Sequence, residues 1–134
     1  MKLLIADDDP STAEVLAPLL GASEVTIFTA CSAQETICIL QTELPDVIVL
    51  DAILPDMSGI NLCKTIRKFC NAPILILSAL DSPKTIIAAL QAGADDYIVK
   101  PCSASVIAAH ITKLARRTSS KPRTESTFLS FSTN

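Results

Sequence analysis

Short apolar segments alternate with helix-length segments along most of the chain. The apolar segments lie near residues 2–6, 24–29, 46–51, 73–78 and 96–99, and the helical segments lie near 10–20, 33–43, 58–70, 83–92 and 104–117. This alternation is typical of repeated βαβ units, in which right-handed crossovers place helices on both faces of a parallel sheet. We therefore predict an α/β fold with a doubly wound sheet of five parallel strands and five helices.

Residues that commonly begin or end helices support these boundaries. Ser32 precedes the second helical segment, and Ser82-Pro83 places a capping hydroxyl before a proline at the first helical position. Gly21 and Gly93 follow two of the helical segments, where glycine often ends a helix. The boundary signals therefore agree with the apolar pattern.

An acidic residue, Asp51, stands at the end of the most apolar predicted strand. The run Asp46-Val47-Ile48-Val49-Leu50-Asp51 contains four consecutive apolar residues, which is typical of a strand buried on both faces. In open parallel α/β sheets, ligands bind at the carboxyl ends of the strands. Asp51 is therefore a candidate for chemistry.

Polar residues also end or follow three other predicted strands, namely Asp7-Asp8-Asp9, Ser78 and Lys100. The carboxyl ends of parallel strands share one edge of the sheet, and crowded carboxylates resist ionisation unless a cation is near. We expect Asp7, Asp8 and Asp51 to hold Mg²⁺ or Mn²⁺, because such ions prefer oxygen ligands. Asp51 could then attack phosphorus as a nucleophile. Lys100 and Ser78 could contact the oxygens of the phosphoryl group.

Each of these features has a plainer explanation when it is taken alone. An acidic run before a helix commonly caps that helix. A serine after a strand is commonly a turn residue, and a Lys-Pro pair usually lies in a loop. Their occurrence at four strand ends in a consistent order favours the functional interpretation.

Composition narrows the class of protein. The 134 residues carry a net charge of −3, which argues against nucleic-acid binding through bulk charge. No apolar run approaches the length of a membrane span. The five cysteines have no CxxC spacing, and a single histidine makes a zinc site unfavourable. Buried or half-buried free thiols in a reducing compartment fit this pattern, so we expect a cytoplasmic protein.

Four motifs together resemble the receiver domain of two-component response regulators. They are Leu4-Ile5-Ala6-Asp7-Asp8-Asp9, Asp46 to Asp51 with Leu54-Pro55-Asp56-Met57-Ser58-Gly59, Ile76-Leu77-Ser78-Ala79, and Ala92 to Pro101. The resemblance covers residues 1–117 and implies a flavodoxin-like sheet with strand order 2-1-3-4-5. It also implies that the domain is no enzyme in the usual sense, although it promotes its own phosphorylation and dephosphorylation.

The same resemblance assigns roles to individual residues. Asp51 would accept a phosphoryl group from a sensor histidine kinase. Asp7, Asp8 and the backbone carbonyl of Ile53 would join Asp51 as metal ligands. Ser78 would be the switch hydroxyl, Tyr97 the aromatic residue that follows the switch, and Lys100 the phosphate partner. A cis peptide bond before Pro101 is also implied.

Two segments resemble the winged-helix (OmpR/PhoB) subfamily of transcription factors, namely Gly93 to Pro101 and the helix ending in Leu114-Ala115-Arg116-Arg117-Thr118. In that subfamily a DNA-binding domain follows a linker, so transcriptional control is the expected output. We expect residues 118–134 to be a disordered linker or tail that could include the start of an output domain. The chain as given is not expected to contact nucleic acid directly.

The sequence departs from that subfamily on the surface formed by segments 83–92, 96–99 and 104–117. Cys102 stands where phenylalanine is usual, and Ile86 and Val106 replace an oppositely charged pair. His110 replaces the usual arginine partner of Asp96. We therefore expect a homodimer held by apolar contact through this surface. The residues expected at the interface are Ile86, Ile87, Leu90, Asp96, Val106 and His110.

Three other functions compete with this interpretation. A haloacid-dehalogenase-type enzyme also uses an aspartyl phosphate, but it needs a second aspartate where Ile53 stands. A degenerate receiver would act only as a phosphorylation-independent protein-interaction module. A true flavodoxin would carry a phosphate-binding loop rich in Ser, Thr and Gly after the first strand, and Asp7-Asp8-Asp9 is no such loop.

Overall fold

Five parallel strands form the centre of the protein, in the order β2-β1-β3-β4-β5. The computed structural model describes residues 1–21 and 24–120. The strands are β1 (Lys2–Ala6), β2 (Thr26–Ala30), β3 (Val47–Asp51), β4 (Ile74–Ser78) and β5 (Asp96–Val99). The strand order and the parallel direction confirm the predicted flavodoxin-like fold.

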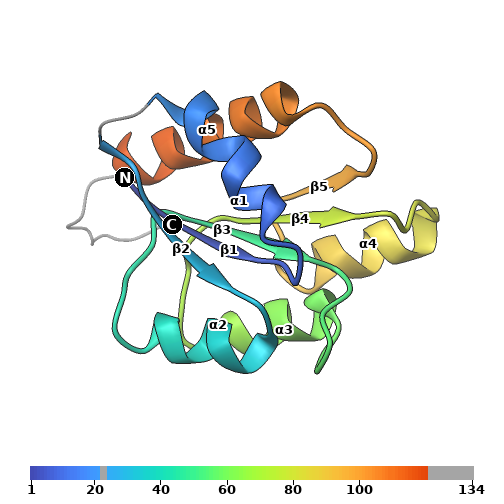
Figure 1. Cartoon of the computed structure of the whole chain (residues 1–134). Helices are drawn as coiled ribbons and strands as arrows, with labels where there is room; N and C mark the ends of the chain where they lie inside the picture. The colour runs from blue at the N-terminus through green and yellow to red at the C-terminus, as the bar shows by residue number, and fades with distance from the viewer. Residues whose placement is uncertain (22–23, 121–134) are drawn as a thin grey trace.

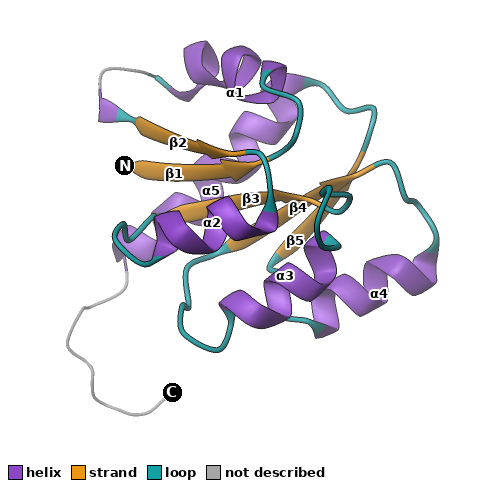
Figure 2. Cartoon of the chain, turned by 60° about the horizontal axis from the view of Figure 1, so that its bottom comes forward, coloured by secondary structure: helices purple, strands orange, loops and turns teal. Residues whose placement is uncertain are grey.

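Helices cover both faces of the sheet (Figure 1). They are α1 (Ser11–Leu16), which continues into the 3₁₀ helix η1 (Ala17–Leu20), and α2 (Ala33–Leu40), α3 (Gly59–Ile66), α4 (Pro83–Gln91) and α5 (Ala104–Ser120). Helices α1 and α5 lie on one face, and α2, α3 and α4 lie on the other, as Figure 2 shows from a second direction.

Side chains of the central strands alternate between two hydrophobic cores. Leu4 and Ile48 of neighbouring strands point into the core under α2, α3 and α4. Leu3 and Val49 point into the core under α1 and α5. Successive residues of a strand face opposite sides of the sheet, so an uninterrupted apolar strand fills both cores at once. Strand β3 has this form, and its last residue, Asp51, emerges at the edge of the sheet.

The helix starts agree with the predicted caps. The Ser32 hydroxyl accepts a hydrogen bond from the Glu35 N–H, and the Ser82 hydroxyl accepts one from the Thr85 N–H. Gly21 has a φ of 72° at the end of η1, a conformation that costs glycine little. The Lys100–Pro101 bond is cis, as the resemblance implied.

Several predicted boundaries were wrong by a few residues. The predicted helix 10–20 is divided, because Pro18 cannot donate an α-helical hydrogen bond and the chain tightens into η1. Helix α3 ends at Ile66 rather than near residue 70, and α5 continues to Ser120, beyond the predicted end at residue 117. The predicted linker or tail therefore begins inside α5, and its residues 121–134 lie outside the described part of the chain.

Arg67, the residue after the last residue of α3, donates hydrogen bonds to several carbonyl groups that follow the helix. Its guanidinium donates hydrogen bonds to the carbonyl oxygens of Cys70, Ala72 and Gly93, and it pairs with Asp95 at 3.0 Å. A second Asp95 contact, from the Ile74 N–H at 2.9 Å, joins this cluster to β4. These bonds fasten α3 to the start of β4 and β5, at the edge of the sheet away from Asp51.

The cysteine prediction was partly wrong. All five thiols are free, but Cys31 and Cys38 are exposed, while Cys63 is buried and Cys70 and Cys102 are half-buried. Among the described residues, no helix combines the length and the apolar character needed to cross a lipid bilayer.

Candidate phosphoacceptor site

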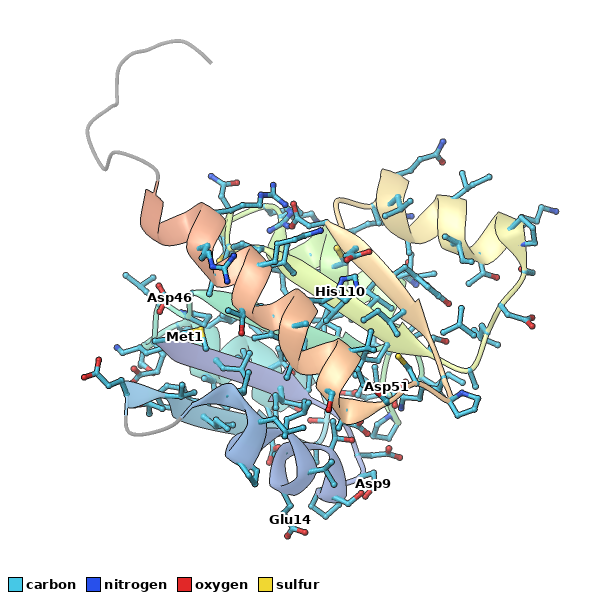
Figure 3. The ribbon with its side chains drawn as sticks, turned by 90° about the horizontal axis from the view of Figure 1, so that it is seen from above. Met1, Asp9, Glu14, Asp46, Asp51 and His110 are labelled. Atoms are coloured by element: carbon cyan, nitrogen blue, oxygen red, sulfur yellow. The ribbon has the colours of Figure 1, made fainter. Side chains whose placement is uncertain are left out.

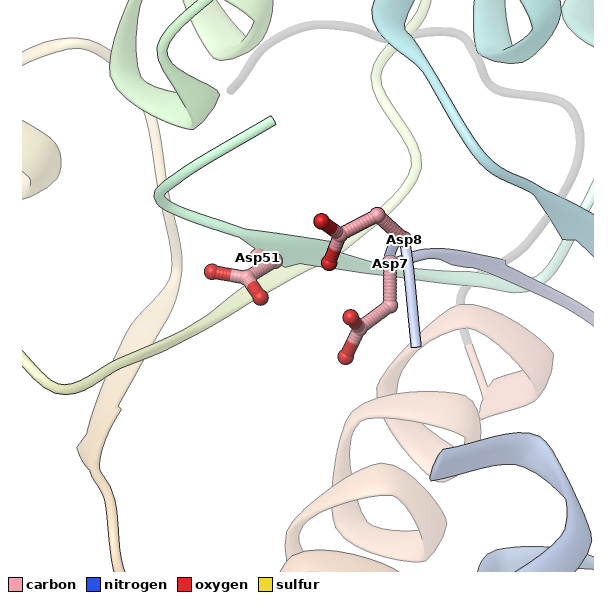
Figure 4. A group of neighbouring side chains, drawn as sticks. All are labelled: Asp7, Asp8 and Asp51. Carbon is pink, nitrogen blue, oxygen red and sulfur yellow. The ribbon is translucent and has the colours of Figure 1, made fainter. Parts of the chain in front are cut away.

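Three carboxylates meet at one edge of the sheet, where two neighbouring strands end (Figure 4). Each of Asp7, Asp8 and Asp51 offers one oxygen atom, and these atoms all lie within 4.8 Å of one another. Asp7 is buried, Asp51 is partly buried and Asp8 is exposed. Figure 3 shows Asp51 and Asp9 at one end of the molecule and Met1 and Asp46 at the other, so the cluster lies at the carboxyl ends of the strands.

A divalent cation fits this cluster chemically. Mg²⁺ and Mn²⁺ favour carboxylate oxygens and keep water in their remaining positions, which an exposed ligand such as Asp8 allows. Three carboxylates at this spacing repel one another, and a cation would remove that repulsion. The structure therefore brings together the three side chains that the sequence predicted as ligands.

Asp51 is contacted by the backbone on one side and by a lysine on the other. One oxygen accepts a hydrogen bond from the Ile53 N–H at 2.9 Å, and the other lies 3.3 Å from Lys100 Nζ. Burial raises the pKa of the Asp51 carboxyl above its ordinary value, against the opposing effects of the Ile53 N–H and the Lys100 charge. The side chain thus has one oxygen fixed by the backbone and one beside a cation.

Asp7 accepts hydrogen bonds from two residues that follow it closely in the sequence. Its Oδ1 accepts the Asp9 N–H at 2.9 Å, and its Oδ2 accepts the Thr12 hydroxyl at 2.8 Å. Lys100 Nζ lies 3.8 Å from the same Oδ2. Thr12 was not predicted as a site residue, because a hydroxyl in the first turn of a helix has many local partners and the sequence does not reveal which one it selects.

Asp9 serves a different purpose from its two neighbours. Its Oδ1 accepts hydrogen bonds from both the backbone N–H and the hydroxyl of Ser11, at the start of α1. These two bonds lower the pKa of the Asp9 carboxyl, and the bond from the Ser11 backbone has the larger effect. Asp9 therefore behaves as the helix-capping residue of the triplet and lies outside the cluster of three acids.

The loop after β3 folds back tightly over Asp51. Ile53 pairs with Ser58 across this loop, and the side chain of Ile53 is 57% exposed. Gly59 approaches the backbone so closely that a Cβ atom there would lie 2.3 Å from the Asp51 carbonyl oxygen. The other end of the loop is tied to α2 by Asp56, which accepts the N–H groups of Ala33 and Gln34.

Ser78 and Tyr97 meet through the backbone of Leu80. Ser78 is fully buried, and its hydroxyl oxygen accepts the Leu80 N–H at 2.9 Å. The Tyr97 hydroxyl donates to the Leu80 carbonyl oxygen at 2.7 Å. The loop between β4 and α4 is therefore bonded to the sheet edge through Ser78 and to the β5 side through Tyr97.

The residues predicted for the dimer surface lie on α4, β5 and α5. Ile87, Leu90 and Val106 are 54%, 46% and 46% exposed, whereas Ile86 is half-buried. Asp96 and His110 pair within one chain, with 2.5 Å between Asp96 Oδ2 and His110 Nδ1. Helix α4 fully buries only Ala89. Much of its apolar surface therefore remains uncovered.

Comparison with known protein families agrees with this geometry. The response regulator receiver domain family matches residues 3–112. "Probable transcriptional regulator ycf27" of Guillardia theta is 38% identical over 117 residues, which cover 87% of this chain and 46% of the relative. "Response regulator MprA" of Mycobacterium avium is 34% identical over 133 residues, covering 98% of this chain and 58% of the relative. The chain thus spans about half the length of these curated relatives.

Solved structures show the same fold. A two-component response regulator from Clostridium difficile superposes with a TM-score of 0.83 at 32% identity, covering 90% of this chain and 99% of the other. The BeF3-activated N-terminal receiver domain of Klebsiella pneumoniae RstA gives a TM-score of 0.78 at 30% identity, covering 87% and 99%. With its family match, its relatives and its fold in agreement, the chain belongs to the response regulator receiver domain family.

Proposed function

We propose that this chain is a phosphoacceptor signalling domain in which Asp51 receives a phosphoryl group from a sensor histidine kinase. The observation that carries the proposal is the placement of the Asp51 carboxylate, with two acids close by and Lys100 Nζ 3.3 Å away. One carboxylate oxygen forms the new bond to phosphorus. The bond from phosphorus to the donor breaks, and its electron pair leaves with the donor.

Asp7, Asp8, Asp51 and the backbone carbonyl of Ile53 would hold Mg²⁺ or Mn²⁺ in this site. The cation would neutralise charge on the transferring phosphoryl group. Lys100 would contribute a second positive charge beside Asp51, where it pairs with Asp51 Oδ2. The domain would thereby promote its own phosphorylation and dephosphorylation without turning over a separate substrate.

The backbone of Leu80 offers a connection from the site to the rest of the domain. If Ser78 turns its hydroxyl toward the phosphoryl oxygens, its bond to the Leu80 N–H is lost. The Leu80 carbonyl, which accepts from Tyr97, lies in the next peptide unit of the same residue and would shift when the Leu80 N–H is released. Phosphorylation would in this way shift the population between two packings of the β4–α4 loop and Tyr97.

The output surface in this proposal is the face formed by α4, β5 and α5. Its exposed apolar residues Ile87, Leu90 and Val106 support a homodimer through this face. The name "Probable transcriptional regulator ycf27" supports transcriptional control by the whole protein. In this proposal the segment after α5 links the receiver to a winged-helix domain, as the resemblance to that subfamily implies. The receiver itself would not touch nucleic acid.

Phosphorylation by a small donor tests this function. The parent and Asp51→Asn are incubated with acetyl phosphate, with and without Mg²⁺, and their intact masses are compared. We expect the parent to gain one phosphoryl group only with Mg²⁺, and Asp51→Asn to gain none. A parent that stays unmodified under every condition would favour a phosphorylation-independent interaction module instead.

A further inference from the structure

The hydroxyl of Thr12 is hydrogen-bonded to one of the three clustered acids. Thr12 Oγ1 lies 2.8 Å from Asp7 Oδ2, and an ionised carboxylate has no proton to give, so the threonine is the donor. Thr12 lies in the first turn of α1, five residues after Asp7. The bond therefore joins the first helix to the carboxylate at the end of the first strand.

This bond completes the positioning of Asp7. The Asp9 N–H holds Oδ1 at 2.9 Å, and Thr12 holds Oδ2, so both oxygens of the side chain have a fixed neutral donor. The Asp7 side chain is only 4% exposed, so water contributes little to its orientation. Two neutral donors also leave the negative charge of the carboxylate intact for a cation.

Helix capping does not explain the Thr12 hydroxyl. A capping side chain accepts a hydrogen bond from a backbone N–H, whereas this hydroxyl donates to a carboxylate. No side-chain cap is made by the residue before α1, and the Ser11 N–H is already satisfied by Asp9. Thr12 also lines a pocket of about 560 Å³ together with Lys100, the lysine that pairs with Asp51.

We propose that Thr12 is a positioning residue for the divalent cation site, acting by holding Asp7 in the orientation that a metal ligand needs. This inference rests on the proposed function, because it presumes that Asp7 binds the cation. Hydrogen-bonding partners of metal ligands commonly change metal affinity by about 10–100-fold when they are removed. We expect an effect in the lower part of that range, because the Asp9 N–H remains.

Two variants of Thr12 separate positioning from general packing. Thr12→Val keeps the shape of the side chain and removes the donor, whereas Thr12→Ser keeps the donor and removes a methyl group. The matched control is Ser11→Ala, which removes a neighbouring hydroxyl that is bonded to Asp9 rather than to Asp7. Mg²⁺ alone is titrated into each protein, and binding is followed by the NMR shifts of the backbone amides around Asp51.

We expect Thr12→Val to weaken Mg²⁺ binding roughly tenfold, with Thr12→Ser and Ser11→Ala close to the parent. The unfolding midpoint without Mg²⁺ is measured for each variant, so that a loss of folding is recognised. A folded Thr12→Val that binds Mg²⁺ as tightly as the parent would overturn the role of Thr12 while leaving the proposed function intact. A parent that binds no Mg²⁺ would instead overturn the cation site itself.

Discussion

At the scale of single residues, the proposed chemistry depends on Asp51, which is partly buried in a cluster of three carboxylates. Burial raises the pKa of the Asp51 carboxyl, although the Ile53 N–H and Lys100 oppose that effect. A raised pKa means that folding disfavours the ionised form. The arrangement is therefore costly to the folded state at neutral pH, and a bound cation can relieve that cost.

The stability of Asp51→Asn tests this cost. Above its raised pKa, ionised Asp51 destabilises the folded protein, and the penalty disappears as pH falls through that pKa toward the ordinary value of 3.8. We expect Asp51→Asn to raise the unfolding midpoint by a few degrees at neutral pH and to differ little from the parent near pH 4. Thermal unfolding at both pH values measures the difference. Asp81→Asn, at an exposed position before α4, is the control and should change neither value.

Metal affinity separates Asp8 from Asp9. Asp8 belongs to the cluster of three acids, whereas Asp9 bonds Ser11 at the start of α1. We expect Asp8→Ala to lower Mg²⁺ affinity at least about tenfold, because a direct ligand is lost, and Asp9→Ala to retain most of it. Titration with Mg²⁺ decides the matter, and equal affinities in the two variants would show that the ligand is wrongly assigned within the triplet.

At the scale of elements, the site depends on loops that bend sharply at strand ends. Asp56 ties the loop after β3 to the start of α2, and its bonds to Ala33 and Gln34 lower the pKa of its carboxyl. That contribution to stability is present at neutral pH and is lost as pH falls through the lowered pKa, below 3.8. Gly59 closes the same loop against Asp51.

A methyl group at Gly59 tests how far the loop geometry supports the site. Its Cβ would meet the Asp51 carbonyl oxygen and the Ala52 Cα, which are backbone atoms that cannot turn away. We expect Gly59→Ala to destabilise the fold by about 2–3 kcal/mol and to weaken Mg²⁺ binding. Gly21→Ala is the control, because nothing lies within 4 Å of its Cβ and only the positive φ is strained. It should cost about 1 kcal/mol and leave Mg²⁺ binding unchanged.

Local signals in the sequence predicted the elements better than the contacts between them. The meeting of Asp7, Asp8 and Asp51 followed from apolar runs and from the shared edge of a parallel sheet. The cap at Ser32 followed from a hydroxyl before a helical segment, and the strand order was implied by the resemblance to receiver domains. The bond from Thr12 could not be predicted in this way. Hydroxyl partners are chosen by distances of a few tenths of an ångström, and neighbouring residues in the sequence do not fix such distances.

The contacts of Asp56 and Arg67 were missed for a related reason. Asp56 caps a helix that begins 23 residues earlier, and Arg67 bonds the carbonyl of Gly93, 26 residues later. Both contacts need the packed fold before they can form. Pro18, by contrast, was a local signal for the division of the first helix. The prediction of one continuous helix followed the apolar pattern and gave this proline too little weight.

At the scale of the whole molecule, a buried sheet separates two different surfaces. The acids lie at the carboxyl edge of the strands, while the exposed apolar side chains of α4 and α5 lie beside β5. Ser78, Leu80 and Tyr97 lie between these regions. The proposed signal therefore has a continuous set of contacts along which to act.

Association through the α4-β5-α5 face gives a prediction at this scale. Ile87 is 54% exposed, and Val15, on α1, is 53% exposed, so the two are β-branched apolar residues of similar fractional exposure in different places. We expect the parent to dimerise, with little dependence on salt, because apolar contacts are not screened. Ile87→Lys should weaken the dimer at least about tenfold, since it buries an unpaired charge, while Val15→Lys should not.

Sedimentation velocity with and without beryllofluoride measures this association. A parent that remains monomeric at high micromolar concentration in both states would contradict the proposed interface. Equal losses in Ile87→Lys and Val15→Lys would place the contact elsewhere or show that it is unspecific.

The central claim, that Asp51 is the residue that becomes phosphorylated, is tested most directly by locating the acyl phosphate. Protein treated with acetyl phosphate and Mg²⁺ is reduced with borohydride, which converts a phosphorylated aspartate into homoserine, and the peptides are sequenced by mass spectrometry. We predict homoserine at position 51 alone. Homoserine at Asp7, Asp8 or Asp9 with Asp51 unchanged would contradict the account.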